Sequence, residues 1–122
     1  MGSIVHFDLP VDDPKRAVKF YSGLFGWKFT KAGGGMEYYF IEIPDDTSAP
    51  LRGGMGLRED PAQRITNYIG VPSVDEYLEK VVLAGGKVVL GRQAVPGFGY
   101  LAQCLDTEGN LFGLWQEEPT VV

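Results

Sequence analysis

Cysteine is nearly absent from this sequence: Cys104 is the only one among 122 residues. A single thiol cannot form an internal disulfide, so nothing favours secretion or a disulfide-stabilised fold. Long apolar runs are also missing, since none approaches the roughly 20 residues of a membrane-spanning helix. The N-terminus lacks the basic segment and apolar stretch of a signal peptide. By elimination, these absences predict a cytoplasmic protein.

Positive charge is also scarce. The chain has 11 Lys and Arg against 16 Asp and Glu, which gives a net charge of −5 and a pI near 4.7. No block of basic residues occurs, so we expect neither nucleic acid nor an anionic membrane as a partner. The hydrophobic share of 44% and the charged share of 22% are ordinary for one globular domain.

The first half of the chain predicts a strand, a helix and three further strands. Apolar and polar residues alternate over residues 4–9, as in a half-buried strand. Asp13 before Pro14 is typical of a helix start, and apolar residues then recur at helical spacing until Gly26, a typical C-terminal glycine. Segments rich in β-forming residues predict strands at 27–30, 36–43 and 54–58, with a loop over 44–52.

The second half repeats this order after a polar linker at residues 59–64. Ser73 with Glu76 forms a capping box, and Gly85 and Gly86 end the helix. Strands are predicted at 65–71, 87–90, 100–105 and 111–116, with a loop over 95–99. An offset of 60 residues places Gly26 on Gly86. The pattern therefore predicts one α+β domain of two βαβββ modules, at 4–58 and 65–116, with a ferredoxin-like or other open sheet as the alternative.

Two smaller features have plain structural interpretations. Residues 106–110 (DTEGN) superficially resemble a calcium loop but are far too few, so we expect a tight hairpin turn. Cys104 has no basic neighbour in sequence, so we expect a buried, unreactive thiol.

Three segments carry a resemblance to a known family. They are IVHFDLPVDDPKRAVKFYSGLFGWKF at the start, LAGGKV at the end of the second helix, and LDTEGNLFGLWQ near the end. In these segments the chain resembles the vicinal oxygen chelate superfamily, which includes glyoxalase I, extradiol dioxygenases, and bleomycin and fosfomycin resistance proteins. Thr107 stands where the family usually has proline. The resemblance implies two half-barrels that enclose a cup, and a homodimer.

The resemblance also implies four metal-ligand positions in the cup of metal-dependent members. In this chain they fall on His6, on Met55 or Gly56, on Thr66 and on Gly113. A divalent metal prefers several imidazoles and carboxylates, and His6 is the only histidine. We therefore expect no cofactor; if a divalent metal binds, His6 would hold it, with Asp8 adding an oxygen.

A pocket for a small organic molecule is the expectation that remains. Strand alternation places one set of residues on the side that the resemblance assigns to the cup: Ile4, His6, Asp8, Thr66, Tyr68, Gly113 and Trp115. The candidate ligand-binding residues are His6, Asp8, Thr66, Tyr68, Tyr100 and Trp115. The aromatic residues Tyr38, Tyr39, Tyr68, Tyr100 and Trp115 either stack on an aromatic ligand or are ordinary sheet residues. The glycines at 53, 54, 56 and 113 either leave space for a ligand or bend the sheet.

Three hypotheses follow for function. The first is a protein that binds a small organic molecule, with metal-free chemistry as a variant. The second is a metal-dependent glyoxalase-like lyase or isomerase, or a dioxygenase-like enzyme, that uses His6 and Asp8. The third is a structural or regulatory domain whose cup is filled by its own side chains.

Overall fold

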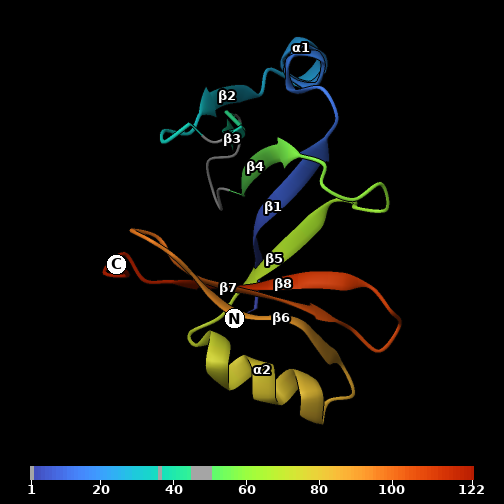
Figure 1. The fold of residues 1–122 in the computed structure, drawn as a ribbon, viewed down its shortest axis with the longest axis vertical. Helices are drawn as coiled ribbons and strands as arrows, with labels where there is room; N and C mark the ends of the chain where they lie inside the picture. Colours follow the sequence, from blue (N-terminus) through green and yellow to red (C-terminus); the bar gives the residue numbers. More distant parts are fainter. Residues whose placement is uncertain (1, 36, 45–50) are drawn as a thin grey trace. The chain divides into compact units, whose positions relative to one another are not determined.

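The computed structural model describes residues 2–35, 37–44 and 51–122 and gives them an α+β fold. The order β-α-β-β-β occurs twice along the chain (Figure 1). The first set is β1 (Ile4–Val11), α1 (Pro14–Phe25), β2 (Lys28–Lys31), β3 (Tyr38–Glu42) and β4 (Arg52–Leu57). The second set is β5 (Thr66–Gly70), α2 (Val74–Leu83), β6 (Lys87–Val95), β7 (Gly99–Leu105) and β8 (Leu111–Glu117). The predicted tandem modules are confirmed.

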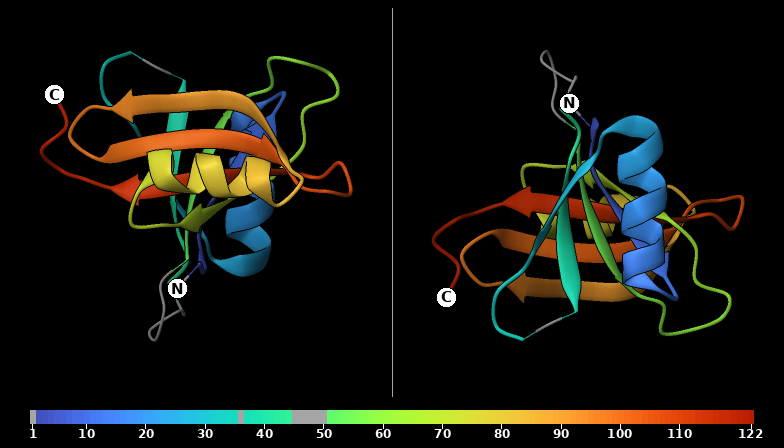
Figure 2. Two further views of the ribbon diagram at one scale, coloured as in Figure 1. Left: turned by 90° about the horizontal axis from the view of Figure 1, so that it is seen from below. Right: turned by 90° about the horizontal axis from the view of Figure 1, so that it is seen from above.

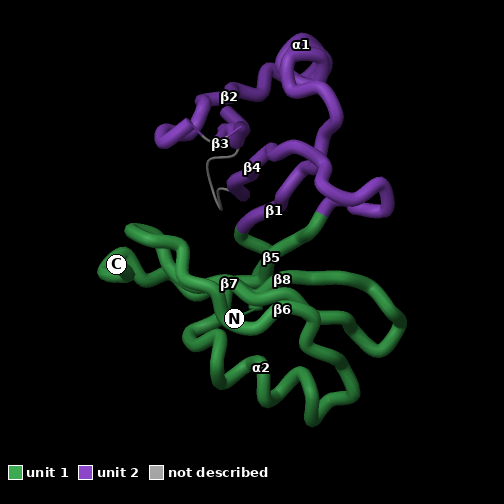
Figure 3. Tube along the Cα trace, viewed as in Figure 1, with its two compact units in different colours: residues 1–5, 66–122 green, residues 6–65 purple. Residues whose placement is uncertain are grey.

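The contacts divide the chain into two units (Figure 3). Unit 2 holds residues 6–65, and unit 1 holds residues 66–122 together with residues 1–5. The strand order is β2-β3-β4-β1 in unit 2 and β6-β7-β8-β5 in unit 1. In each unit the module's first and last strands pair in parallel, and its other pairs are antiparallel. The two modules therefore have the same topology, which differs from the ferredoxin-like alternative.

The core of unit 2 lies between its sheet and α1 (Figure 2, right). Because side chains alternate along β1, one of its faces turns to the core and buries Phe7, Leu9 and Val11. Ile41 and Met55 complete the buried cluster. The helix contributes Ala17, Val18 and Tyr21, and the Tyr21 ring stacks on Trp27 at a centroid distance of 4.9 Å. His6 and Asp8 are thereby left on the opposite face of β1.

Helix α1 begins and ends where the sequence predicts. The Asp13 carboxylate accepts a hydrogen bond from the Arg16 amide at 3.2 Å, which caps the N-terminus. Gly26 has a φ of 71°, in the left-handed region that a side chain rarely adopts, and its amide bonds the Ser22 carbonyl.

The core of unit 1 is built in the same way. Its buried cluster is Val74, Ala102, Cys104 and Leu114, and α2 lies across it with Tyr77, Leu78 and Val81 (Figure 2, left). The Ser73 hydroxyl accepts a hydrogen bond from the Glu76 amide at 3.2 Å, as an N-cap. The Glu76 carboxylate lies 3.2 Å from Lys80 Nζ.

Strand β6 is longer than predicted. The sequence predicts a strand over 87–90, whereas β6 continues to Val95. Its pairing with β7 shifts register between Val88 and Leu90 and again between Leu90 and Gln93. Such irregularities add residues to one strand, and the strand continues past them.

Two predicted features fall partly on residues that are not described. The start of the predicted strand 36–43 at Met36, and residues 45–50 of the predicted loop, lie outside the described residues. Within the described ranges, neither α1 nor α2 is long and apolar enough to cross a membrane.

Candidate functional site

A polar cluster in unit 2 starts from His6 and Asp8 on β1. The two residues are two positions apart, so both side chains stand on the face of β1 opposite the core. His6 Nε2 lies 2.9 Å from Asp8 Oδ1. The side chains are 29% and 38% exposed, so the pair is neither fully buried nor freely solvated.

Tyr38 on β3 joins this pair from 30 residues away. Its hydroxyl donates a hydrogen bond to the same carboxylate oxygen, Asp8 Oδ1, at 2.9 Å. The Tyr38 ring also contacts Phe40 edge-on, with centroids 5.7 Å apart and planes at 84°. We call His6, Asp8, Tyr38 and Phe40 the Asp8 cluster; all four lie in unit 2.

Gly54 on β4 makes this arrangement possible. In the sheet register Gly54 lies opposite Asp8 on one side and Phe40 on the other. A Cβ at position 54 would lie 1.6 Å from Tyr38 Oη and 2.9 Å from Asp8 Oδ1. Only a residue without a side chain therefore lets the Tyr38 hydroxyl cross β4 to reach Asp8.

The Asp8 cluster combines an acceptor with an aromatic wall. An ionised Asp8 accepts hydrogen bonds from His6 and Tyr38 through Oδ1, and such charge-assisted bonds fix the carboxylate's orientation. Phe40 is 43% exposed beside it. A negative carboxylate next to ring faces suits a ligand that is aromatic and carries an N–H or O–H donor or a positive charge.

In unit 1 the candidate ligand-binding residues Thr66 and Tyr68 are buried rather than exposed. They are 5% and 4% exposed. The Tyr68 ring lies over Gly113 of β8, its partner in the register. The Tyr68 hydroxyl accepts a hydrogen bond from Gln103 Nε2 at 3.0 Å. This ring packs against its own sheet.

Tyr100 and Trp115 stand on opposite faces of the β7–β8 pair. Trp115 is opposite Leu101 in the register, whereas Tyr100 shares the face of Ala102. Tyr100 packs against the buried cluster under α2, and the Arg92 guanidinium lies 4.5 Å from the centre of its ring. The structure therefore does not bring Tyr100 together with Trp115 as one ligand surface.

The space above the strand glycines is filled, which contradicts the interpretation that it is left for a ligand. A Cβ at Gly53 would lie 2.4 Å from the Phe7 ring, and one at Gly113 would lie 2.1 Å from the Tyr68 ring. Gly56 has Tyr38 Cδ1 at 3.4 Å. At these positions, and at Gly54, the space above the glycine is taken by an aromatic ring of the same unit.

The residues at the metal-ligand positions do not fit a divalent metal. Met55 is completely buried in the apolar core of unit 2, and Gly113 has no side chain to offer. His6 already bonds Asp8 through Nε2. Among residues 2–35, 37–44 and 51–122, no group of three or more His, Cys, Asp or Glu side chains is placed to hold a metal ion. Zinc and similar ions normally take at least three such protein ligands.

Two other titratable groups have structural explanations. Cys104 is completely buried, and burial raises the pKa of its thiol. The Asp106 carboxylate accepts hydrogen bonds from the Asn110 amide at 2.9 Å, the Asn110 side chain at 3.1 Å and the Glu108 amide at 2.8 Å. These bonds lower the pKa of Asp106 below its ordinary value of 3.8. Residues 106–110 thus form the predicted tight turn, with Gly109 at a φ of 80°.

The sequence does not predict the bond between Tyr38 and Asp8, because Tyr38 is one of several aromatic residues and nothing local links positions 8 and 38. The available signal was alternation: Tyr39 and Ile41 are apolar neighbours that pack into the core, which places Tyr38 and Phe40 on the other face.

Comparisons with known proteins agree on one family. The model of the Glyoxalase/Bleomycin resistance protein/Dioxygenase superfamily matches residues 3–114. A glyoxylase-like domain-containing protein of Didymella fabae is 32% identical over 118 residues, covering 89% of each chain. CFP32 of Mycobacterium bovis, named as a candidate glyoxylase, is 32% identical over 113 residues, which are 89% of this chain and 43% of that protein.

Other proteins match at lower identity or over part of their length, and the solved structures among them share the fold. The anthracycline biosynthesis protein DnrV of Streptomyces peucetius is 28% identical over 95% of this chain and 47% of its own length. The present chain thus spans less than half of CFP32 and of DnrV. The crystal structure of BH1468 from Bacillus halodurans has a TM-score of 0.74 at 18% identity, covering 96% of this chain and 95% of that one. Methylmalonyl-CoA epimerase from Mycobacterium tuberculosis has a TM-score of 0.70 at 16% identity, covering 97% and 89%.

Proposed function

Because this chain belongs to the glyoxalase/bleomycin resistance protein/dioxygenase superfamily, we propose that it binds a small aromatic molecule at the Asp8 cluster without a divalent metal. The observation that carries the proposal is the Asp8 carboxylate, held by both His6 and Tyr38 at 2.9 Å beside the exposed Phe40 ring. The proposal includes a homodimer, as the family resemblance implies.

The ligand chemistry follows from what Asp8 still offers. Oδ1 is used by the two bonds within the cluster, whereas a carboxylate has about four lone-pair sites in total. A ligand N–H or O–H group aimed at the remaining sites would gain a charge-assisted hydrogen bond. The rings of Tyr38 and Phe40 would add contact with an aromatic body or a cation. Aromatic amines and phenols are therefore the compounds to test first.

The binding test is a thermal-shift screen of aromatic amines and phenols, followed by calorimetry on any hit. A ligand at 100 times its Kd stabilises the native state by about 2.7 kcal/mol, which raises the unfolding midpoint measurably. Asp8→Asn removes the charge and is expected to weaken binding at least tenfold, because hydrogen bonds to a charged group contribute about 1.5–3 kcal/mol.

A matched pair of tyrosines supplies the control. Tyr38→Phe removes the hydroxyl that orients Asp8, whereas Tyr39→Phe changes the next residue of β3, which packs into the core and whose hydroxyl meets Glu37 at 3.4 Å. We expect the first variant to weaken binding and the second to leave it unchanged. Equal binding by the wild-type protein and Asp8→Asn would place the ligand elsewhere and refute the proposal.

Metal content separates this proposal from a metal-dependent glyoxalase or dioxygenase. We expect the purified protein to contain zinc, nickel, iron and manganese well below one ion per chain, and His6→Ala to leave that content unchanged. One equivalent of any of these metals, lost in His6→Ala, would favour the metalloenzyme instead.

A further inference from the structure

A cleft of about 500 Å³ lies elsewhere in unit 2, beside the N-terminal half of α1. Its lining comes from the end of β1, from α1, and from residues 58–65, all within unit 2. None of the four residues of the Asp8 cluster lines it. Leu9 and Val11, which do, face away from His6 and Asp8 along β1. The cleft is therefore a separate feature.

Arginine is concentrated around this cleft. Three of the chain's five arginines line it: Arg16, Arg58 and Arg64. The charged residues of the lining are these three and two carboxylates, Asp12 and Asp13. Their formal sum is +3 − 2 = +1, in a chain whose net charge is −5. The cleft thus favours anions although the chain as a whole repels them.

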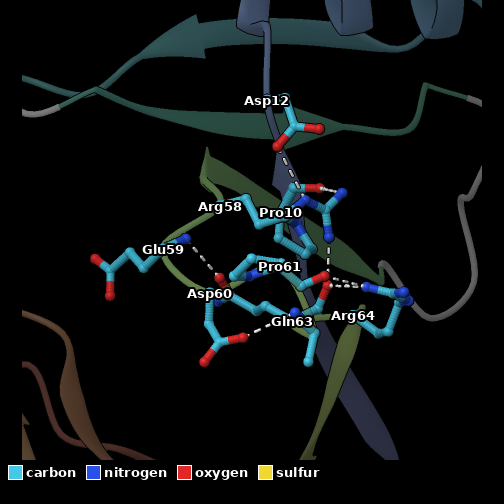
Figure 4. A network of polar contacts seen from close by, with 9 residues as sticks. Pro10, Asp12, Arg58, Glu59, Asp60, Pro61, Gln63 and Arg64 are labelled. Atoms are coloured by element: carbon cyan, nitrogen blue, oxygen red, sulfur yellow. Dashed lines mark hydrogen bonds and ion pairs between the residues drawn. The ribbon is translucent and has the colours of Figure 1, made fainter.

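Arg58 fixes one wall of the cleft rather than offering a binding group (Figure 4). Its Nε lies 3.1 Å from Asp12 Oδ1, and Nη2 donates to the Pro10 carbonyl at 3.1 Å. Nη1 donates to the Gln63 carbonyl. The loop that follows is held further by Gln63 Oε1, which accepts from the Glu59 amide at 2.9 Å. The wall is therefore tied to the end of β1.

Arg16 and Arg64 are the groups left to meet an anion. Arg64 Nη1 donates to the carbonyls of Pro61 and Gln63, both at 2.9 Å, which holds it beside the cleft. Neither Arg16 nor Arg64 forms an ion pair with a carboxylate of the described residues. The two acids of the lining are engaged, since Asp12 pairs with Arg58 and Asp13 caps α1.

The rest of the lining is apolar and partly aromatic. Phe20 and Ile65 are 55% and 53% exposed at the cleft, and Tyr21 and Ala17 lie on the same side of α1. The Phe20 and Tyr21 rings meet at 84°, with centroids 5.1 Å apart. An apolar surface with two cations at its border matches a flat ring that carries a carboxylate.

We propose that this cleft is a second binding site, which takes an aromatic carboxylate with its ring against Phe20 and Ile65 and its carboxylate at Arg16 and Arg64. The site is independent of the Asp8 cluster and selects the opposite ligand charge. Guanidinium groups bind carboxylates in a planar, two-bond geometry that lysine cannot reproduce.

The probe is 2-naphthoate, compared with 2-(aminomethyl)naphthalene as a similar ring of opposite charge. Isothermal titration and amide NMR shifts on the full chain measure both. We expect saturable binding of 2-naphthoate, weakened by added salt, with the largest shifts at Phe20, Tyr21 and Ile65. No saturable binding up to about 10 mM, beyond the roughly millimolar range of weak specific sites, would refute the site. So would shifts located elsewhere.

Charge-removing variants test the two arginines. Arg16→Gln and Arg64→Gln are each expected to raise the Kd of 2-naphthoate about fivefold, the upper range for a partly exposed charge pair. Lys19→Gln, on the same helix but outside the cleft, is the matched control and is expected to change the Kd less than twofold. Phe20→Ala is expected to weaken binding of 2-naphthoate, because it removes the ring that the naphthyl group contacts. An unchanged Kd in the Arg16→Gln/Arg64→Gln double variant would overturn the proposal.

Discussion

The substitution Gly113→Ala should destabilise the protein strongly. The new Cβ would lie 2.1, 2.2 and 2.7 Å from three carbons of the Tyr68 ring. Non-bonded carbons prefer about 3.5–4.0 Å, so the ring has to move by more than ~1 Å. Tyr68 is only 4% exposed, and it cannot swing into solvent. The strain must therefore spread into the pairing of β5 with β8.

The size of the effect can be worked out from the contacts. Overpacking of this kind costs about 1–3 kcal/mol. Displacing the ring also endangers the bond from Gln103 to the Tyr68 hydroxyl, which contributes about 0.5–1.5 kcal/mol. The expected loss in the free energy of unfolding is thus about 2–4 kcal/mol, or roughly 8–16 °C in midpoint for a chain of this size.

Urea denaturation followed by circular dichroism is the assay. Gly91→Ala is the matched control, because Gly91 lies in a strand of the same unit and a Cβ added there would have no atom within 4 Å. It is expected to stay within about 1 kcal/mol of wild type. In a Tyr68→Ala background, Gly113→Ala should cost much less. If Gly113→Ala and Gly91→Ala unfold at the same urea concentration, the packing of Tyr68 on Gly113 is wrong.

Three further outcomes are expected. Gly54→Ala should weaken binding at the Asp8 cluster while Gly56→Ala, whose Cβ would meet Tyr38 Cδ1 at 3.4 Å, should not; equal affinities in calorimetry would contradict this. The pKa of Asp106 is lower in the folded protein than its ordinary value of 3.8. The ionised carboxylate therefore stabilises the folded state above pH 3.8, and this stabilisation is lost as the pH falls through the folded pKa. Asp106→Asn should therefore flatten the acid side of a midpoint-against-pH curve, and an unchanged curve would count against the turn bonds. Cys104 should resist alkylation at pH 8 until urea unfolds the chain, so rapid labelling of native protein would disprove its burial.

The order of helices and strands can be predicted from the sequence because the patterns that mark their ends are local and occur in both modules. Asp13 with Pro14, Gly26 and Ser73 mark helix ends through backbone chemistry that acts within a few residues, and the structure has the same ends. The sequence predicts the strand β6 only as far as residue 90, whereas the structure continues it to Val95 through two register shifts. Local patterns therefore predict elements well, except where the pattern itself is interrupted.

The contacts of the Asp8 cluster are harder to predict from the sequence because they depend on the register between paired strands. The bond between Tyr38 and Asp8 exists only because β3 and β4 align to put Gly54 between them. A shift of one residue would turn Tyr38 to the other face. Tyr100 shows the same dependence, since its register partner decides that it joins the core face rather than the face of Trp115.

The distribution of tryptophan offers a spectroscopic consequence. The chain has two, Trp27 and Trp115, and each unit contains one of them. In Trp27→Phe the only tryptophan emission comes from Trp115 in unit 1. In Trp115→Phe it comes only from Trp27 in unit 2. Fluorescence of the two single-tryptophan proteins can thus report whether the modules lose their structure together or in sequence. The duplicated architecture thereby carries its own pair of optical reporters.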